Sequence, residues 1–279
     1  MAEALLWGLV AGSSLAVGGA LALSLPISRL VLGLVMAFGA GVLISAVAYE
    51  LVDEAVTTSA GSGGVALGLF AGALTFFVGD AIIDRLGGAE RKDSGGGQAA
   101  GSAPAIVLGI VLDGVPETAV IGLSLLGGGG VSTAVIAAVF ISNVPESIAA
   151  TSGLAASGWR PRRIMLLWAG VGLVCAPAAP AGYGLFDDAA GRTVAFVQAF
   201  AGGAILTMLA DTMMPEAFAH GGRLVGLATT LGFAVAFGIS ALDRAPRRRR
   251  PESCGGPARA ARRPPRGAGR RAPARCRAR

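Results

Sequence analysis

The chain has 279 residues, of which 53% are hydrophobic and only 14% are charged, and its mean hydropathy is +0.67. These values exclude an ordinary soluble domain or an intrinsically disordered chain for the body of the protein. The formal net charge of +6 conceals two opposite parts, because 14 of the 23 basic residues lie in the 36 positions from Arg244 onward. Residues 1–243 hold 9 basic and 16 acidic groups, a net charge of −7, so a basic nucleic-acid-binding domain is not expected there.

Apolar stretches recur eight times, each about as long as the ~20 residues that cross a hydrocarbon core. The expected spans are 4–24, 31–52, 65–84, 104–126, 131–156, 163–186, 193–217 and 222–242. Each must be helical, because an open strand in lipid leaves its amide groups unpaired and the alternation typical of a barrel strand is missing. The sequence therefore predicts an all-α polytopic membrane protein whose eight transmembrane helices form one domain, residues 1–243.

The basic residues between the spans predict the orientation of the chain in the membrane. Eight of nine Lys and Arg residues lie in the breaks after the first, third, fifth and seventh spans, and only Arg192 lies in the others. The positive-inside rule then places the N-terminus outside, in a plasma or bacterial inner membrane. No basic residue precedes the first span, so a cleaved signal peptide is not expected.

Two segments of unusual composition interrupt or follow the spans. Residues 87–103 are rich in Gly and Ser and are expected to form a flexible cytoplasmic loop. The Arg- and Pro-rich tail, residues 244–279, is expected to be disordered. Its arginines suit anionic lipid headgroups or nucleic acid, but a low-complexity extension without a role is the alternative we favour. With the N-terminus outside, an even number of spans also places this tail outside, which conflicts with the positive-inside rule. Either the tail is tolerated outside or one of the eight expected spans is wrong.

Two pairs of similar segments indicate internal repeats. Residues 37–44 resemble residues 199–206 at an offset of 162, and both continue to an acid–Ala pair, Glu54-Ala55 and Glu216-Ala217. The two segments run in opposite directions through the membrane, which predicts an inverted repeat of helices 1–3 and 6–8 around a central pair, helices 4 and 5.

The central pair carries a second repeat, residues 113–118 and 142–147, each with a Pro-Glu dipeptide inside its span. An ionised carboxylate in mid-membrane costs at least ~2.5–3.5 kcal/mol and needs a counter-charge, and neither span holds a basic residue. A bound cation, a proton or both would neutralise the acids, whereas protonated acids bonded between helices are the structural alternative. The candidate metal ligands are Asp113, Glu117, Ser142, Asn143 and Glu146, and the candidate route residues are Asp211, Glu54 and Glu216.

These Pro-Glu motifs resemble those of the ZIP (Zrt-, Irt-like) family of divalent metal transporters. The chain is similar to a divergent, bacterial-type member of that family. The segments AFGAGVLISAVAYELVDEA and AFAGGAILTMLADTMMPEA are also similar to that family, so the resemblance covers residues 1 to about 243. It implies eight helices, both termini outside and uptake of zinc or iron through a centre on helices 4 and 5. Asp113 and Ser142 stand where the family has histidines, Gly114 where it has asparagine, and Cys175-Ala176-Pro177 lacks the family's glutamate before proline.

We therefore expect a transporter that takes divalent cations into the cytoplasm. Its expected partners are the transported metal ion and the lipid bilayer, and no organic cofactor is expected. Loss of both imidazoles favours manganese, iron or magnesium over zinc by ligand type, although zinc also binds carboxylate oxygen. The alternative is a metal-sensing or scaffold membrane protein without transport, and a homodimer is left open. An enzyme is not expected, because no span contains histidine and no G-x-S-x-G or H-E-x-x-H motif occurs.

Overall fold

The computed structural model describes residues 1–59, 63–89, 103–127 and 131–244, and every regular element among them is helical. The α-helices are α1 (Ala2–Ser24), α2 (Arg29–Ala46), α3 (Asp53–Ser59), α4 (Gly63–Ile83), α5 (Ala103–Ser124), α6 (Thr133–Ala156), α7 (Pro161–Cys175), α8 (Ala178–Gly184), α9 (Gly191–Met208), α10 (Met214–Gly221) and α11 (Val225–Arg244). Short π-helical turns are η1 (Val47–Val52), η2 (Asp84–Gly88) and η5 (Leu209–Met213), and 3₁₀ turns are η4 (Leu125–Gly127) and η6 (Gly222–Leu224). The predicted all-α class is confirmed for the described residues.

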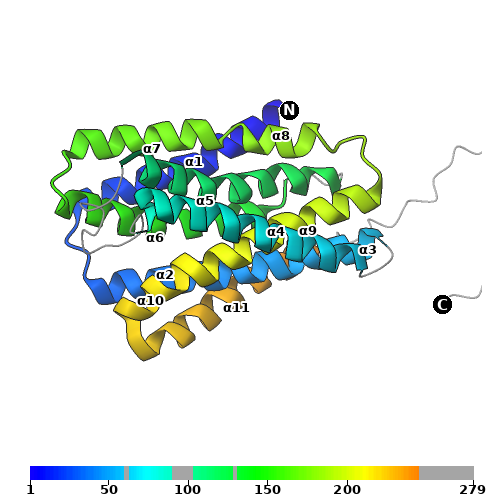
Figure 1. Cartoon of the computed structure of the whole chain (residues 1–279). Helices are drawn as coiled ribbons and strands as arrows, with labels where there is room; N and C mark the ends of the chain where they lie inside the picture. Colours follow the sequence, from blue (N-terminus) through cyan, green and yellow to red (C-terminus); the bar gives the residue numbers. More distant parts are fainter. Residues whose placement is uncertain (60–62, 90–102, 128–130, 245–279) are drawn as a thin grey trace, which may run out of the picture. The chain divides into compact units, whose positions relative to one another are not determined.

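Seven helical stretches of the described chain are long and apolar enough to cross a membrane. The last of them, Gly191–Leu242, has 52 residues and includes the expected spans 193–217 and 222–242. A straight helix of that length would measure about 78 Å against a core of about 30 Å. The chain instead turns back at Gly222, whose φ of +54° favours glycine, and α10 and α11 form the two arms of this turn (Figure 1).

The helices pack in two layers. One layer contains α1 and α5–α8, and the other contains α2–α4 and α9–α11 (Figure 1). The closest helix pairs depend on glycine: a Cβ on Gly72 of α4 would lie 1.8 Å from the Phe200 carbonyl oxygen, and one on Gly232 of α11 would lie 2.0 Å from that of Phe38. The layers meet where α2 packs on α6 and α5 packs on α9.

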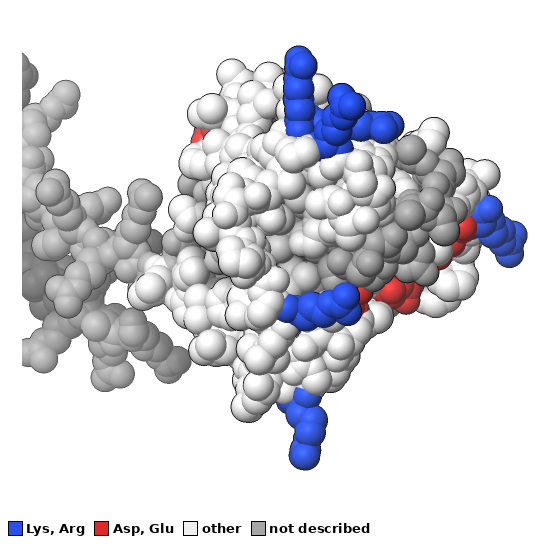
Figure 2. All heavy atoms as spheres, turned by 90° about the vertical axis from the view of Figure 1, so that its left-hand side faces the viewer, with Lys and Arg blue, Asp and Glu red and all other residues white. Residues whose placement is uncertain are grey.

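Most of the described arginines lie at one end of these helices. Arg29 begins α2, Arg85 lies in η2, Arg160 caps α7 and Arg223 lies in η6. Figure 2 shows this end of the molecule, where Lys and Arg side chains, in blue, project from the surface at several places. The start of α9, which carries Arg192, lies at the opposite end (Figure 1).

Most of the two segments of unusual composition falls outside the described residues. Gly87 and Gly88 of the predicted loop 87–103 belong to η2, and residues 90–102 lie outside. The tail 244–279 lies outside from residue 245 on. Their predicted flexibility and disorder stay predictions.

Candidate metal site

Both predicted prolines lie inside regular helix, Pro116 in α5 and Pro145 in α6. Neither residue has an amide proton to donate to the carbonyl four positions earlier, at Leu112 and Ile141. Each helix therefore has a weakened turn beside its acidic residues. Gly39 of α2 packs against the second of these turns, where a Cβ on it would lie 3.3 Å from Ser142 Cα and 3.4 Å from Pro145 Cγ.

All five predicted ligands are buried. The exposed fractions of their side chains are 2% for Asp113, 1% for Glu117, 0% for Ser142, 4% for Asn143 and 7% for Glu146. Three carboxylates removed from water on two adjacent helices are costly unless charge of opposite sign or protons accompany them.

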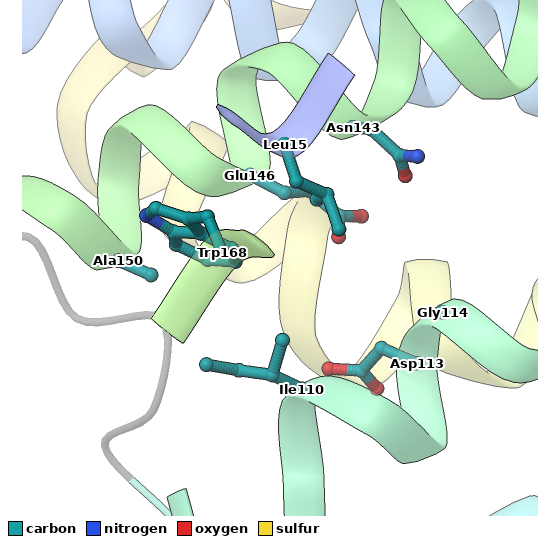
Figure 3. Close-up of a pocket in the computed structure, with 8 residues that line it drawn as sticks. All are labelled: Leu15, Ile110, Asp113, Gly114, Asn143, Glu146, Ala150 and Trp168. Atoms are coloured by element: carbon teal, nitrogen blue, oxygen red, sulfur yellow. The ribbon is translucent and has the colours of Figure 1, made fainter. Parts of the chain in front are cut away.

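A cavity of about 20 Å³ lies between α5 and α6, with room for about one water molecule. Asp113 lines it from α5, and Asn143 and Glu146 line it from α6, so oxygen atoms from both helices face one space (Figure 3). The rest of the wall is Gly114 and the apolar residues Leu15, Ile110, Ala150 and Trp168. The structure thus brings three of the five predicted ligands together.

The Asn143 amide is oriented by the first helix. Its Nδ2 atom donates a hydrogen bond of 3.3 Å to the Ala11 carbonyl oxygen on α1, and no other described residue bonds to the side chain. Asn143 also lines the cavity, and no described residue donates a hydrogen bond to its amide oxygen. An oxygen held in this way is suited to a cation.

The other two predicted ligands do not line the cavity. The Ser142 hydroxyl donates to the Val139 carbonyl oxygen at 3.0 Å, and the Ser142 Cα atom lies 3.3 Å from where a Cβ on Gly39 of α2 would be. Ser142 therefore faces α2, one position around α6 from Asn143. Glu117 lies one helix turn beyond Asp113 and is buried outside the cavity wall.

Cys175, the last residue of α7, lies against α5, a contact that the sequence does not predict. A Cβ on Gly114 of α5 would lie 3.0 Å from the Cys175 sulfur. In the sequence, the only sign of a functional role for Cys175 is that cysteine, a common metal ligand, occurs in an apolar span.

The candidate route residues lie away from the cavity. Asp211 is in η5 and is exposed. Glu54 lies in α3, and Glu216 of α10 pairs with His220 at 2.9 Å between Oε1 and Nε2. Within the described part of the chain, no three His, Cys, Asp or Glu side chains lie close enough together to hold a metal ion.

Comparison with known proteins gives one informative similarity. No protein-family model matches the chain. A protein of Arabidopsis thaliana named "Putative zinc transporter" is 29% identical over 189 residues, which is 67% of this chain and 30% of that protein. The aligned region therefore spans less than a third of its relative. Together with the seven long apolar helices, this similarity supports a multi-pass membrane protein related to a zinc transporter.

Proposed function

We propose that the chain is a ZIP-type transporter that moves divalent metal cations into the cytoplasm through the cavity between α5 and α6. The observation that carries the proposal is the set of oxygen atoms on Asp113, Asn143 and Glu146, which face one small cavity from two proline-containing helices. A divalent cation there would neutralise carboxylates that the bilayer otherwise penalises. The similarity to a named zinc transporter agrees with this cargo.

The chemistry of the wall suits transient binding. Carboxylate and amide oxygens bind zinc as well as harder cations such as manganese, iron and magnesium. The side chains do not converge on one point in this structure, so a bound ion would draw α5 and α6 together. A site that needs such a movement holds its cargo weakly enough to release it, which transport requires.

We further propose eight spans with an inverted repeat. Three pairs of element boundaries support this proposal. Helices α2 and α9 begin at residues 29 and 191 and end at residues 46 and 208. The π-helical turns that follow them, η1 and η5, begin at residues 47 and 209. Each pair is separated by the offset of 162 that the sequence repeat has. A π-helical turn at the same place in both halves is hard to explain by composition alone.

The arginine-bearing end is proposed to face the cytoplasm of a plasma or bacterial inner membrane. With eight spans, both ends of the helical domain then lie outside. Transport would need relative movement of packed helices, as in other carriers built from repeats. The packing divides the helices into the two layers described above, so we place the moving boundary between those layers.

Uptake into proteoliposomes tests the proposal. Wild-type protein should accumulate at least one of Zn²⁺, Mn²⁺, Fe²⁺ and Mg²⁺, and Glu146→Gln and Asp113→Asn should lose most of that uptake. Asp188→Asn is the matched control, because Asp188 is exposed on the turn after α8. Uptake that is absent for all four cations, or equal in all three variants, would refute the proposal.

A metal sensor or scaffold without transport is the second candidate. The lack of a three-ligand cluster among the described residues favours it, as does the loss of both motif histidines. Tight binding of one cation per chain without any flux would identify this function.

A further inference from the structure

The turn between α6 and α7 carries a group of basic side chains, at the end of the molecule that Figure 2 shows. Arg160, Arg162 and Arg163 follow one another closely in the sequence, and all three are exposed. No Asp or Glu occurs within residues 147–186, and none of the three arginines forms an ion pair with a described residue. The described part of the chain therefore supplies no counter-charge for these three guanidinium groups.

An aromatic ring fixes the position of one of these side chains. The Arg163 guanidinium lies over the Trp159 ring, 3.9 Å from its centroid. A guanidinium stacked on an indole face keeps its N–H donors directed outward, where they suit the oxygen atoms of a phosphate. Tryptophan is also enriched at the depth of lipid headgroups, where one part of its ring system is buried and another is wet. Trp159 is half-buried, so the turn has the features of a segment at the membrane interface.

An exposed apolar stripe on α7 begins one helix turn after these charges. Leu166 and Leu173 are 62% and 65% exposed. They lie four and eleven positions after Arg162, which places all three side chains on one face of the helix. At a rise of about 1.5 Å per residue, the stripe extends about 16 Å from Arg162 to Leu173. One leaflet contributes about 15 Å, half of the hydrocarbon core, so the stripe has the length of one layer of acyl chains.

We propose that the α6–α7 turn and the exposed face of α7 bind an anionic phospholipid. The three arginines surround its phosphate, and Leu166 and Leu173 lie along one of its acyl chains. Such a lipid combines the two chemistries of this surface at the observed separation, because its negative charge lies at the headgroup and its hydrocarbon extends one leaflet below. Three arginines at a membrane surface should favour an anionic over a neutral lipid about 10-fold or more. This inference requires that α7 spans a bilayer, but it depends on neither the cargo nor the direction of transport.

Quenching of Trp159 fluorescence by brominated lipid tests the site. Full-length protein with Trp7→Phe is reconstituted into phosphatidylcholine vesicles that contain a small fraction of brominated phosphatidylglycerol or of brominated phosphatidylcholine. The remaining tryptophan besides Trp159 is Trp168, which is 1% exposed and so is shielded from lipid. Half-maximal quenching should need about 10-fold less of the brominated phosphatidylglycerol than of the brominated phosphatidylcholine.

Two further variants with equal changes of charge distinguish this site from the arginine-rich tail. The site variant carries Arg160→Gln, Arg162→Gln and Arg163→Gln, and the tail variant carries Arg247→Gln, Arg248→Gln and Arg249→Gln. The two brominated lipids should quench the site variant equally, whereas the tail variant should keep the preference for phosphatidylglycerol. Inorganic phosphate should not change this preference, because a free anion lacks the acyl chain that the leucines contact.

Four results would overturn the proposal. The first is equal quenching by the two lipids in the Trp7→Phe protein, and the second is a preference that survives in the site variant. Loss of the preference in the tail variant would assign the lipid binding to the tail. Competition by inorganic phosphate would show that the arginines bind a free anion and not a lipid headgroup.

Discussion

The Glu50 carboxylate of η1 accepts a hydrogen bond of 3.1 Å from the Ser132 hydroxyl, which also caps the N-terminus of α6. Ser240 of α11 donates to the other oxygen of the same carboxylate. One acidic side chain thus joins α11, the end of the α2 helix and the start of the helix that carries Asn143 and Glu146. Glu50 is therefore a link between the two layers.

Replacement of Ser132 should destabilise the protein more than the loss of an ordinary helix cap. Ser132→Ala removes both the cap to the Val135 amide and the bond to Glu50. Ser28→Ala is a matched control, because Ser28 caps α2 through the Val31 amide at the same distance, 3.3 Å. A cap contributes about 0.5–2 kcal/mol and the second hydrogen bond about 1 kcal/mol more.

Thermal unfolding in detergent micelles measures this difference. The account predicts the order wild type, Ser28→Ala, Ser132→Ala from highest to lowest Tm. Equal Tm values for the two variants would show that the bond to Glu50 contributes nothing to stability.

Trp168 and Thr151 should be energetically coupled. The Trp168 indole N–H donates to the Thr151 hydroxyl at 2.7 Å, and both side chains are buried. Thr151→Val leaves the buried indole N–H without an acceptor and should cost about 1–3 kcal/mol. A double-mutant cycle with Trp168→Phe should give a coupling free energy of about 1 kcal/mol, and additivity within ~0.3–0.5 kcal/mol would contradict it.

Helix separation at the site is set by glycine. A Cβ on Gly122 of α5 would lie 1.8 Å from the Ala179 carbonyl oxygen of α8, so Gly122→Ala must push these helices apart. Since α5 carries Asp113 and Glu117, both Tm and metal uptake should fall. Gly170→Ala in α7 is the control, because no atom lies within 4 Å of its Cβ position and alanine should stabilise the helix by ~0.5–1 kcal/mol. Unchanged uptake in Gly122→Ala would mean that α5 does not need this spacing.

Asn143 should contribute through its oxygen more than through its link to α1. Asn143→Ala removes both and should weaken metal binding about 10-fold or more. Asn143→Asp restores an oxygen to the cavity but cannot donate to Ala11, so it should bind metal better than the alanine variant. Metal titration of the purified variants distinguishes them, and an alanine variant that binds as tightly as the aspartate variant would exclude the oxygen as a ligand.

The sequence was sufficient to predict helices that could cross a membrane and the burial of the acids on α5 and α6. A long apolar segment in lipid can only be helical, because its backbone amides must be paired within the segment. Acids inside such a segment are therefore expected to be buried away from water. The positions of Pro116 and Pro145 inside their helices followed for the same reason.

What the sequence could not provide was the contacts between helices. Periodicity shows that Asp113 and Glu117 share a face, but not that Cys175, 58 or more residues away, meets this face at Gly114. Ser142 was expected beside Asn143 in the site, yet one residue is a rotation of about 100° around a helix, and this rotation turns Ser142 to α2. The burial of Asp80 likewise depends on a contact between helices, since α4 packs along α9.

The most direct test of the central claim, that the cargo binds between α5 and α6, is equilibrium zinc binding to purified wild-type, Glu146→Gln and Asp188→Asn protein. The account predicts a single ion per chain in the wild type and in Asp188→Asn, and an affinity at least ~10-fold weaker in Glu146→Gln. Zinc bound to Glu146→Gln with wild-type affinity and stoichiometry would contradict it.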